Sequence, residues 1–206
     1  MIRQAGDRAL LVCPDSHDEL LGVVARLRQV ELPEIADLLP AAETVLVTLH
    51  DGVDQEGAEA AVRQALSTPL TEHNLASDEV EEVIIPVRYD GEDLADVAAI
   101  LGITVEDVIA THTSRTWRCR FIGFTAGFGY LEPDRPGLRV PRRRQSRTAV
   151  PAGAVALADG YSAVYPRRAP GGWQLIGTTE LTMFDLRRSR PALLTAGTRV
   201  RFVAHE

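Results

Sequence analysis

The stretch from residue 117 onward restricts the possible fold most. Short β-type segments recur there between glycine and proline residues, and no helical period separates them. In the first segment two sets of side chains alternate along the chain: Trp117, Cys119 and Phe121 on one face, and Arg118, Arg120 and Ile122 on the other. About eight short strands without helices must close on themselves or stack as two sheets to hide their edges. The sequence therefore predicts a barrel-like β unit.

The first 85 residues follow a different pattern, in which strands and helices alternate. The predicted elements are, in chain order, a strand at 9–13, a helix, a strand at 43–50, a helix at 56–66 and a strand at 80–87. Ser16 and Glu19 have the spacing of a capping box before the first helix. That helix places one apolar face toward the core: Leu20, Val23, Val24, Leu27 and Val30. The pattern indicates a small α+β sandwich.

A polar, acidic stretch at 67–82 is the best domain boundary, which gives domains at 1–82 and 83–206. Charge supports the division. Residues 1–85 carry 17 acidic residues and 5 arginines, whereas residues 112–206 carry 6 acidic residues and 16 arginines. The basic second part favours an anionic ligand or an acidic partner.

Two short predicted helices, at 92–101 and 104–111, flank Gly102 with the spacing of a helix-turn-helix. The second of them begins with Glu106 and Asp107, which would face phosphates with the wrong charge. We therefore expect the helix pair to have a packing role, and we expect no nucleic-acid binding.

Composition excludes several chemistries. All 22 basic residues are arginine, so this chain supplies no P-loop lysine, no Schiff-base lysine and no Ser-Lys dyad. Cys13 and Cys119 are far apart and are expected to be reduced thiols. No apolar run approaches the roughly 18 residues that span a bilayer, and the start of the chain lacks a signal-peptide pattern. We expect a cytoplasmic protein with no membrane association.

Arginine and histidine supply the candidate polar groups. Six arginines fall within 135–147, most of them expected in a solvated loop, with one or two forming a guanidinium fork for a carboxylate, carbamate or phosphate. His112 ends a helix and precedes a strand, so a structural role and an acid–base role are both open. The remaining histidines show no metal-ligand spacing with it, and we expect no metal site: His17, His50, His73 and His205.

Three glycine-rich turns form the strongest site signal, at 121–131 (FIGFTAGFGYL), 150–155 (VPAGAV) and 169–173 (APGGW). Glycine in such turns usually only supplies a positive φ. Gathered at one rim of a barrel, however, their amides can approach a small polar ligand.

These motifs, with VPRRRQSRTAVPAGAV at 140–155 and the closing TAGTRVRFVA, resemble the KipI/PxpB family. That family is also known as allophanate hydrolase subunit 1, or the B subunit of the prokaryotic ATP-dependent 5-oxoprolinase. The resemblance runs from about residue 83 to 204. It implies a small N-terminal α+β domain and a C-terminal cyclophilin-like β-barrel. It also implies assembly with a homologous second subunit, which is allophanate hydrolase subunit 2 or the C subunit of 5-oxoprolinase.

The resemblance also assigns residues to a site. His112 lies in the family's leucine-histidine-serine step and is the candidate acid–base group. The positions matching the family's glycine, aromatic and arginine motifs are the candidate substrate-binding residues: Gly123, Phe124, Gly127, Phe128, Tyr130, Arg142, Arg147, Gly153, Gly171, Gly172 and Trp173. We expect His112, Arg147 and the glycine turns to share a ligand-facing side with the partner subunit.

This chain also departs from the family pattern. Ala126 and Ser146 replace prolines, and Thr178 stands where the family has an arginine. The loss of that arginine puts anion recognition by this segment in doubt. The departures could retune the substrate, or mark a member that assembles without the usual reaction.

The function implied is a subunit of a heteromeric ATP-dependent amide hydrolase, active in the complex and acting on a small cyclic or ureido carboxylate. A heterotetramer of two plus two subunits would suit it. The resemblance implies ATP as a cofactor of the assembled complex. This chain has no recognisable nucleotide motif, so its own contact with ATP is left open. The alternative is a regulator without enzymatic activity that binds and inhibits a sensor histidine kinase. Prolyl isomerase activity is suggested only by the expected fold, and a fold alone is weak evidence for a function.

Overall fold

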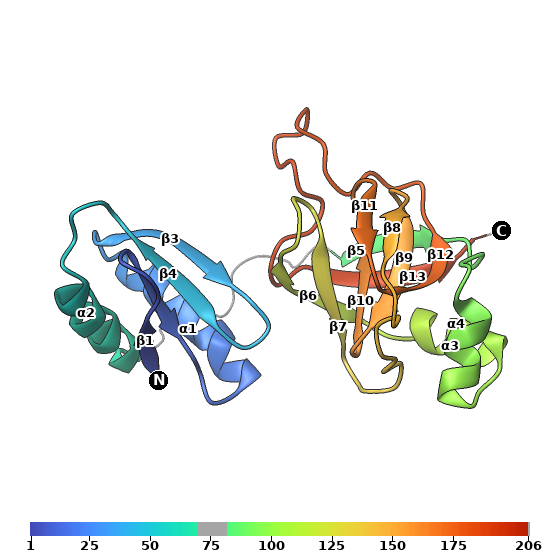
Figure 1. The fold of residues 1–206 in the computed structure, drawn as a ribbon, viewed down its shortest axis with the longest axis horizontal. Helices are drawn as coiled ribbons and strands as arrows, with labels where there is room; N and C mark the ends of the chain where they lie inside the picture. The colour runs from blue at the N-terminus through green and yellow to red at the C-terminus, as the bar shows by residue number, and fades with distance from the viewer. Residues whose placement is uncertain (70–81, 206) are drawn as a thin grey trace. The chain divides into compact units, whose positions relative to one another are not determined.

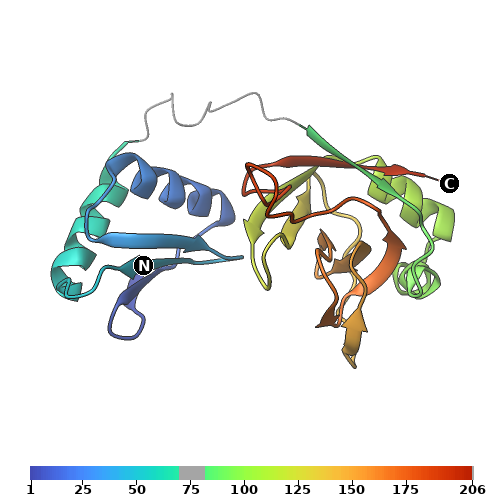
Figure 2. The same cartoon turned by 90° about the horizontal axis from the view of Figure 1, so that it is seen from above.

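The computed structural model describes residues 1–69 and 82–205, which divide into two compact units, Met1–Glu79 and Val80–Glu206 (Figures 1 and 2). Most of the predicted boundary segment at 67–82 lies outside the described residues. The boundary after residue 82 therefore stays a prediction. None of the helices in the described ranges is long and apolar enough to cross a membrane.

The first unit is a two-layer sandwich, as predicted, with two helices packed on a four-stranded antiparallel sheet (Figure 1). The sheet order is β1 (Ile2–Gln4), β2 (Ala9–Val12), β4 (Val45–Leu49) and β3 (Ile35–Pro40). The helices are α1 (His17–Val30) and α2 (Gln55–Ser67). The sequence patterns missed β1 and β3, because both strands are short or half-exposed and show no clean alternation.

Register explains the core of this unit. Leu10 pairs with Val47 and Val12 with Val45, so all four side chains point to the sheet face that the helices cover. The predicted capping box is half formed. The Ser16 hydroxyl accepts a hydrogen bond from the Glu19 amide at 3.2 Å, but the Glu19 carboxylate accepts from the amide of residue 15.

The second unit is a nearly closed barrel, which confirms the predicted fold class. Its seven-stranded sheet follows the order β12 (Gln174–Thr178), β9 (Ala154–Ala158), β10 (Tyr161–Val164), β7 (Gly129–Pro133), β6 (Trp117–Ile122), β13 (Arg199–Ala204) and β5 (Glu82–Val87). Strands β8 (Arg147–Val150) and β11 (Ala169–Gly171) form a separate antiparallel pair. Two backbone hydrogen bonds between Arg88 and Thr178, of 2.9 and 2.8 Å, join the ends of β5 and β12 and bring the two edges of the sheet together.

One strand lies in a different unit from the one that its sequence pattern suggested. The strand predicted at 80–87, counted with the first sandwich, is β5, which pairs in parallel with β13 in the barrel. Counting this strand with the first sandwich was wrong, because hydrophobic periodicity shows which face of a strand is buried, but not which strand is its partner. The predicted second domain, from residue 83, does contain most of β5.

The two short helices have the expected packing role, against the barrel. Helix α3 (Leu94–Leu101) contacts β12, and α4 (Val105–Thr113) contacts β13 (Figure 1). Asp107 completes a capping box with Thr104, since each side chain accepts from the other residue's backbone amide. The acidic start of α4 is thus explained by helix capping.

Candidate functional site

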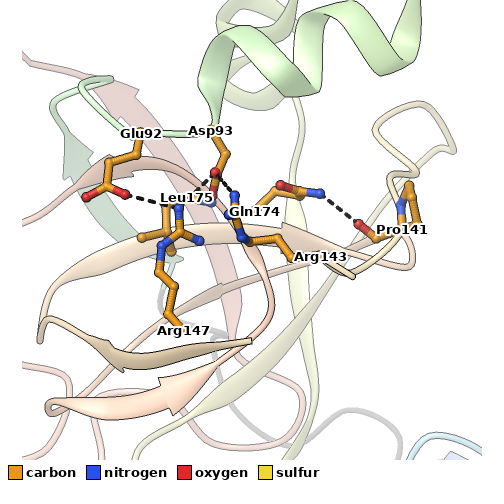
Figure 3. A network of polar contacts seen from close by, with 7 residues as sticks. All are labelled: Glu92, Asp93, Pro141, Arg143, Arg147, Gln174 and Leu175. Carbon is orange, nitrogen blue, oxygen red and sulfur yellow. Dashed lines mark hydrogen bonds and ion pairs between the residues drawn. The ribbon is translucent and has the colours of Figure 1, made fainter. Parts of the chain in front are cut away.

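The site is built around a buried carboxylate at the start of α3. The Asp93 side chain is 2% exposed and accepts from the Leu175 amide at 2.7 Å through Oδ2. Its other oxygen, Oδ1, accepts from Arg147 Nη2 at 2.8 Å and from Arg143 Nη1 (Figure 3). One carboxylate therefore fixes two guanidinium groups from a segment about 50 residues further along the chain.

Arg147 is the better anchored of the two arginines. Its side chain is 16% exposed, and a second acceptor, Glu92 Oε2, lies 3.1 Å from Nη2. The hydrogen bond to Asp93 is the main reason why the pKa of Arg147 is raised above its ordinary value. An arginine side chain is charged even at its ordinary pKa, and this contact favours the charged form further. Arg143 is 34% exposed, and its backbone amide donates to the Gly172 carbonyl at 2.7 Å.

Both arginines keep unused donors. Nε of Arg143 and Nη1 of Arg147 are buried atoms with no hydrogen-bond partner in the described structure. A buried donor without a partner costs roughly 1–3 kcal/mol. Native proteins rarely leave such donors unpaired, and a bound water or ligand is a common explanation.

An aromatic cluster from other segments of the barrel unit meets one of the neighbouring arginines, Arg142. Phe128 and Tyr130 each meet the Trp173 ring edge to face, with ring centroids 5.5 Å apart. The Arg142 guanidinium carbon lies 6.0 Å from the centre of the Trp173 ring, at the outer limit of a cation–π contact. The structure thus brings together four of the predicted substrate-binding residues.

Phe124 stands out within this cluster. Its ring is 58% exposed and rests edge to face on Phe128 and Tyr165. Its φ of 62° lies in the left-handed region, which costs a residue with a Cβ roughly 1 kcal/mol or more. An exposed aromatic ring held in a strained backbone suits a contact with a ligand or a partner.

The predicted glycines serve mainly to allow close packing. A Cβ on Gly171 would lie 2.2 Å from the Tyr165 hydroxyl, and one on Gly153 would lie 2.3 Å from the Thr179 carbonyl oxygen. Gly123, Gly127 and Gly172 are likewise crowded, by Tyr130, Phe184 and Ser146 respectively. The role of these glycines in binding a ligand therefore stays a prediction.

His112 lies in the core of the barrel and is completely buried. Its Nδ1 meets the Tyr89 hydroxyl at 2.7 Å, and its Nε2 meets the Ser162 hydroxyl at 2.9 Å. Burial lowers the pKa of His112 to about 3, so the ring is neutral near pH 7. The structure thus brings a serine to a histidine, but both residues are fully buried.

This burial bears on the predicted roles of the reactive groups. A solute cannot reach His112 in the described structure, so its catalytic role remains a prediction that the geometry does not support. Burial raises the pKa of the Cys119 thiol to about 12, which makes it a poor nucleophile. Among the residues that the structure describes, no group of three or more His, Cys, Asp or Glu side chains could hold a metal ion.

The departure at Thr178 lies at the barrel seam. Its hydroxyl donates to Asp90 at 2.9 Å and lies 3.4 Å from an Arg88 nitrogen. A pocket of about 560 Å³ opens beside it, lined by both polar and apolar residues: Pro86, Arg88, Thr178, Thr179, Glu180, Leu181 and His205. Although the family's arginine is absent at position 178, Arg88 from the neighbouring strand end supplies a guanidinium here.

Sequence reasoning missed Asp93, Arg143 and Tyr165 as members of the site. Asp93 was only weakly indicated by the sequence, as one of two acidic residues after Gly91 at the start of a predicted helix. Nothing in the local sequence, however, indicates that its partners lie at 143 and 147. For Tyr165, only the packing shows that its hydroxyl lies against Gly171.

Comparison with known proteins agrees with this architecture. The profile of the family described as carboxyltransferase domain, subdomain C and D, matches residues 1–194. The chain belongs to this family. A curated relative, the B subunit of 5-oxoprolinase from Escherichia coli O157:H7, is 37% identical over 179 residues, covering 85% of this chain and 81% of the relative.

Solved structures show the same fold in larger chains. TTHA0988 superimposes with a TM-score of 0.80 at 33% identity, over 97% of this chain. This chain spans only 40% of the TTHA0988 chain. Kluyveromyces lactis urea carboxylase superimposes with a TM-score of 0.77 over 100% of this chain and 22% of its own, and at 18% identity it shows the fold alone.

Proposed function

We propose that this chain is the B-type subunit of a heteromeric, ATP-dependent amide hydrolase of the 5-oxoprolinase kind. Its family membership and a relative named as the B subunit of 5-oxoprolinase, 37% identical, support the proposal. The substrate would be a small cyclic or ureido carboxylate. ATP would be used by the assembled complex.

One structural observation carries the idea of a composite site. Three groups suited to nucleophilic or acid–base chemistry, His112, Ser162 and Cys119, are completely buried in the barrel unit. The surface near Trp173 instead offers arginines and aromatic rings. Such a surface can bind and orient a charged ligand, and it can stabilise negative charge that develops in a reaction. The bond-making groups would come from the second subunit.

Each predicted surface group has a task in this proposal. Arg147 holds an anionic part of the substrate or of a phosphorylated intermediate. Arg142 and Trp173 form one wall, and the exposed Phe124 ring contacts the ligand or the partner subunit.

The test is co-purification of this chain with a homologous C-type subunit, followed by an ATPase assay with and without 5-oxoproline. A stable complex whose ATP turnover rises with 5-oxoproline supports the proposal. A stable complex without that response would move the substrate elsewhere. A chain that binds no such partner would refute the proposal and favour the histidine-kinase regulator.

A further inference from the structure

We infer that Arg143 and Arg147 form a paired oxyanion site for a carboxylate or a phosphate group, and that Asp93 is the residue that positions both. The inference rests on the proposed function, because it names the ligand group and its binding residues on the same surface. It adds Arg143 and Asp93 to the site.

The positioning follows from the three contacts of Asp93. Oδ2 is occupied by the Leu175 amide of β12, while Oδ1 receives one guanidinium nitrogen from each arginine (Figure 3). With its side chain 2% exposed, Asp93 has almost no access to solvent that could replace either contact. The two guanidinium groups, which would otherwise repel each other, are thereby held side by side.

The charge balance of the group favours an anion. Two guanidinium groups share one buried carboxylate, which leaves an excess of one positive charge. Glu92 is the other acidic contact of Arg147, but its side chain is 77% exposed, and solvent screens it. A ligand oxyanion would complete the neutralisation in a partly desolvated setting, where charge pairing is stronger than in water.

The unused donors fit the same ligand. Nε of Arg143 and Nη1 of Arg147 are buried and unpartnered, although each side chain is partly open to solvent. Carboxylates and phosphates accept two parallel N–H bonds from guanidinium groups. In this inference, the two donors are the groups left to bind the oxyanion.

The experiment measures binding of two probes, inorganic phosphate and 5-oxoproline, to the full chain and to its complex with the C-type partner, by isothermal titration calorimetry. The variants are Arg143→Gln, Arg147→Gln, Asp93→Asn and Asp93→Glu. Arg144→Gln is the matched control, because it removes the same charge from an exposed position in the same segment. Thermal melts of each variant verify folding.

We expect each arginine variant to weaken binding of at least one probe about tenfold or more, as expected for loss of a charge-assisted hydrogen bond. Asp93→Asn should weaken it similarly, and Asp93→Glu should restore part of the affinity, while Arg144→Gln leaves it unchanged. The probe that binds tells whether the site takes a phosphate or a carboxylate. Equal affinity of wild type and both arginine variants, or no saturable binding of either probe, would overturn the inference.

A kinetic arm separates this inference from the proposed function. If 5-oxoproline stimulates the ATPase of the complex, the arginine and Asp93→Asn variants should raise the KM for 5-oxoproline, if the site takes a carboxylate, or the KM for ATP, if it takes a phosphate, more than they lower kcat. Stimulation with both KM values unchanged in all three variants would refute the oxyanion site and leave the proposed function standing. The complex could instead show no stimulation of its ATPase by 5-oxoproline while the variants still lose probe binding. That result would support the oxyanion site and reject the proposed function.

Discussion

Lowering the pH should destabilise the barrel through one buried side chain, His112. The ring is completely buried, and both of its nitrogens are hydrogen-bonded to hydroxyl groups, those of Tyr89 and Ser162. It also lies 4.2 Å from the Phe202 ring, centroid to centroid. A proton on this ring would have to be accommodated without any facing carboxylate in these contacts.

The sign and size of the effect follow from the two pKa values of His112. Burial lowers its pKa in the folded state to about 3, from an ordinary value of 6.5. Below pH 6.5 the unfolded chain therefore binds a proton that the folded chain does not, and stability falls as the pH falls toward 3. At roughly 1.4 kcal/mol per pH unit, His112 should lower the free energy of unfolding by about 2 kcal/mol between pH 7 and pH 5.

Urea denaturation followed by tryptophan fluorescence reports on unfolding of the barrel unit, since Trp117 and Trp173 both lie in that unit. The control is His112→Gln, whose amide can still donate and accept but does not titrate. His112→Asn serves if the first variant does not fold. The difference in free energy of unfolding between wild type and variant should shrink by about 2 kcal/mol from pH 7 to pH 5. A difference that stays constant over this range would refute the reasoning.

Three further predictions concern packing and reactivity. Asp93→Ala should lower the free energy of unfolding by about 3 kcal/mol in urea titrations, because it leaves two arginines without their shared carboxylate; a loss below about 1 kcal/mol would contradict this. Gly171→Ala should lower the melting temperature, at a cost of about 1–3 kcal/mol, because its Cβ would lie 2.2 Å from the Tyr165 hydroxyl; an unchanged melt would argue against so tight a contact. Iodoacetamide should alkylate the half-exposed Cys13 and spare Cys119 in the folded protein, as mass spectrometry can show; rapid labelling of both would count against the buried thiol.

Local sequence patterns predicted much of the fold, wherever a residue's role depends on its near neighbours. The alternation at Trp117, Cys119 and Phe121 indicated the buried face of β6, and all three side chains are buried. Gly102, with a φ of 67°, ends α3 as a glycine in the left-handed region does. Caps, turns and alternation are local because they involve residues only a few positions apart.

The candidate site was predicted less completely. The motifs indicated Arg142, Arg147 and Trp173. Arg142 does lie over the Trp173 ring, whereas Arg147 pairs with Asp93. The motifs gave no sign that His112 is buried, because the groups that enclose it come from strands and loops up to 90 residues away. A histidine in a family motif has the same local pattern whether it faces solvent or the core.

The sequence by itself determined the alternation of strands and helices, the closure of a β-rich second part, the excess of arginine there and the absence of lysine chemistry. Only the tertiary structure decided that β5 pairs with β13, more than 100 residues later, and that Asp93 holds Arg143 and Arg147. The physical reason for this difference is that the residues of a short segment determine which face of a strand or helix is apolar and where the backbone turns. The partner of a buried charge is chosen by the folded chain as a whole.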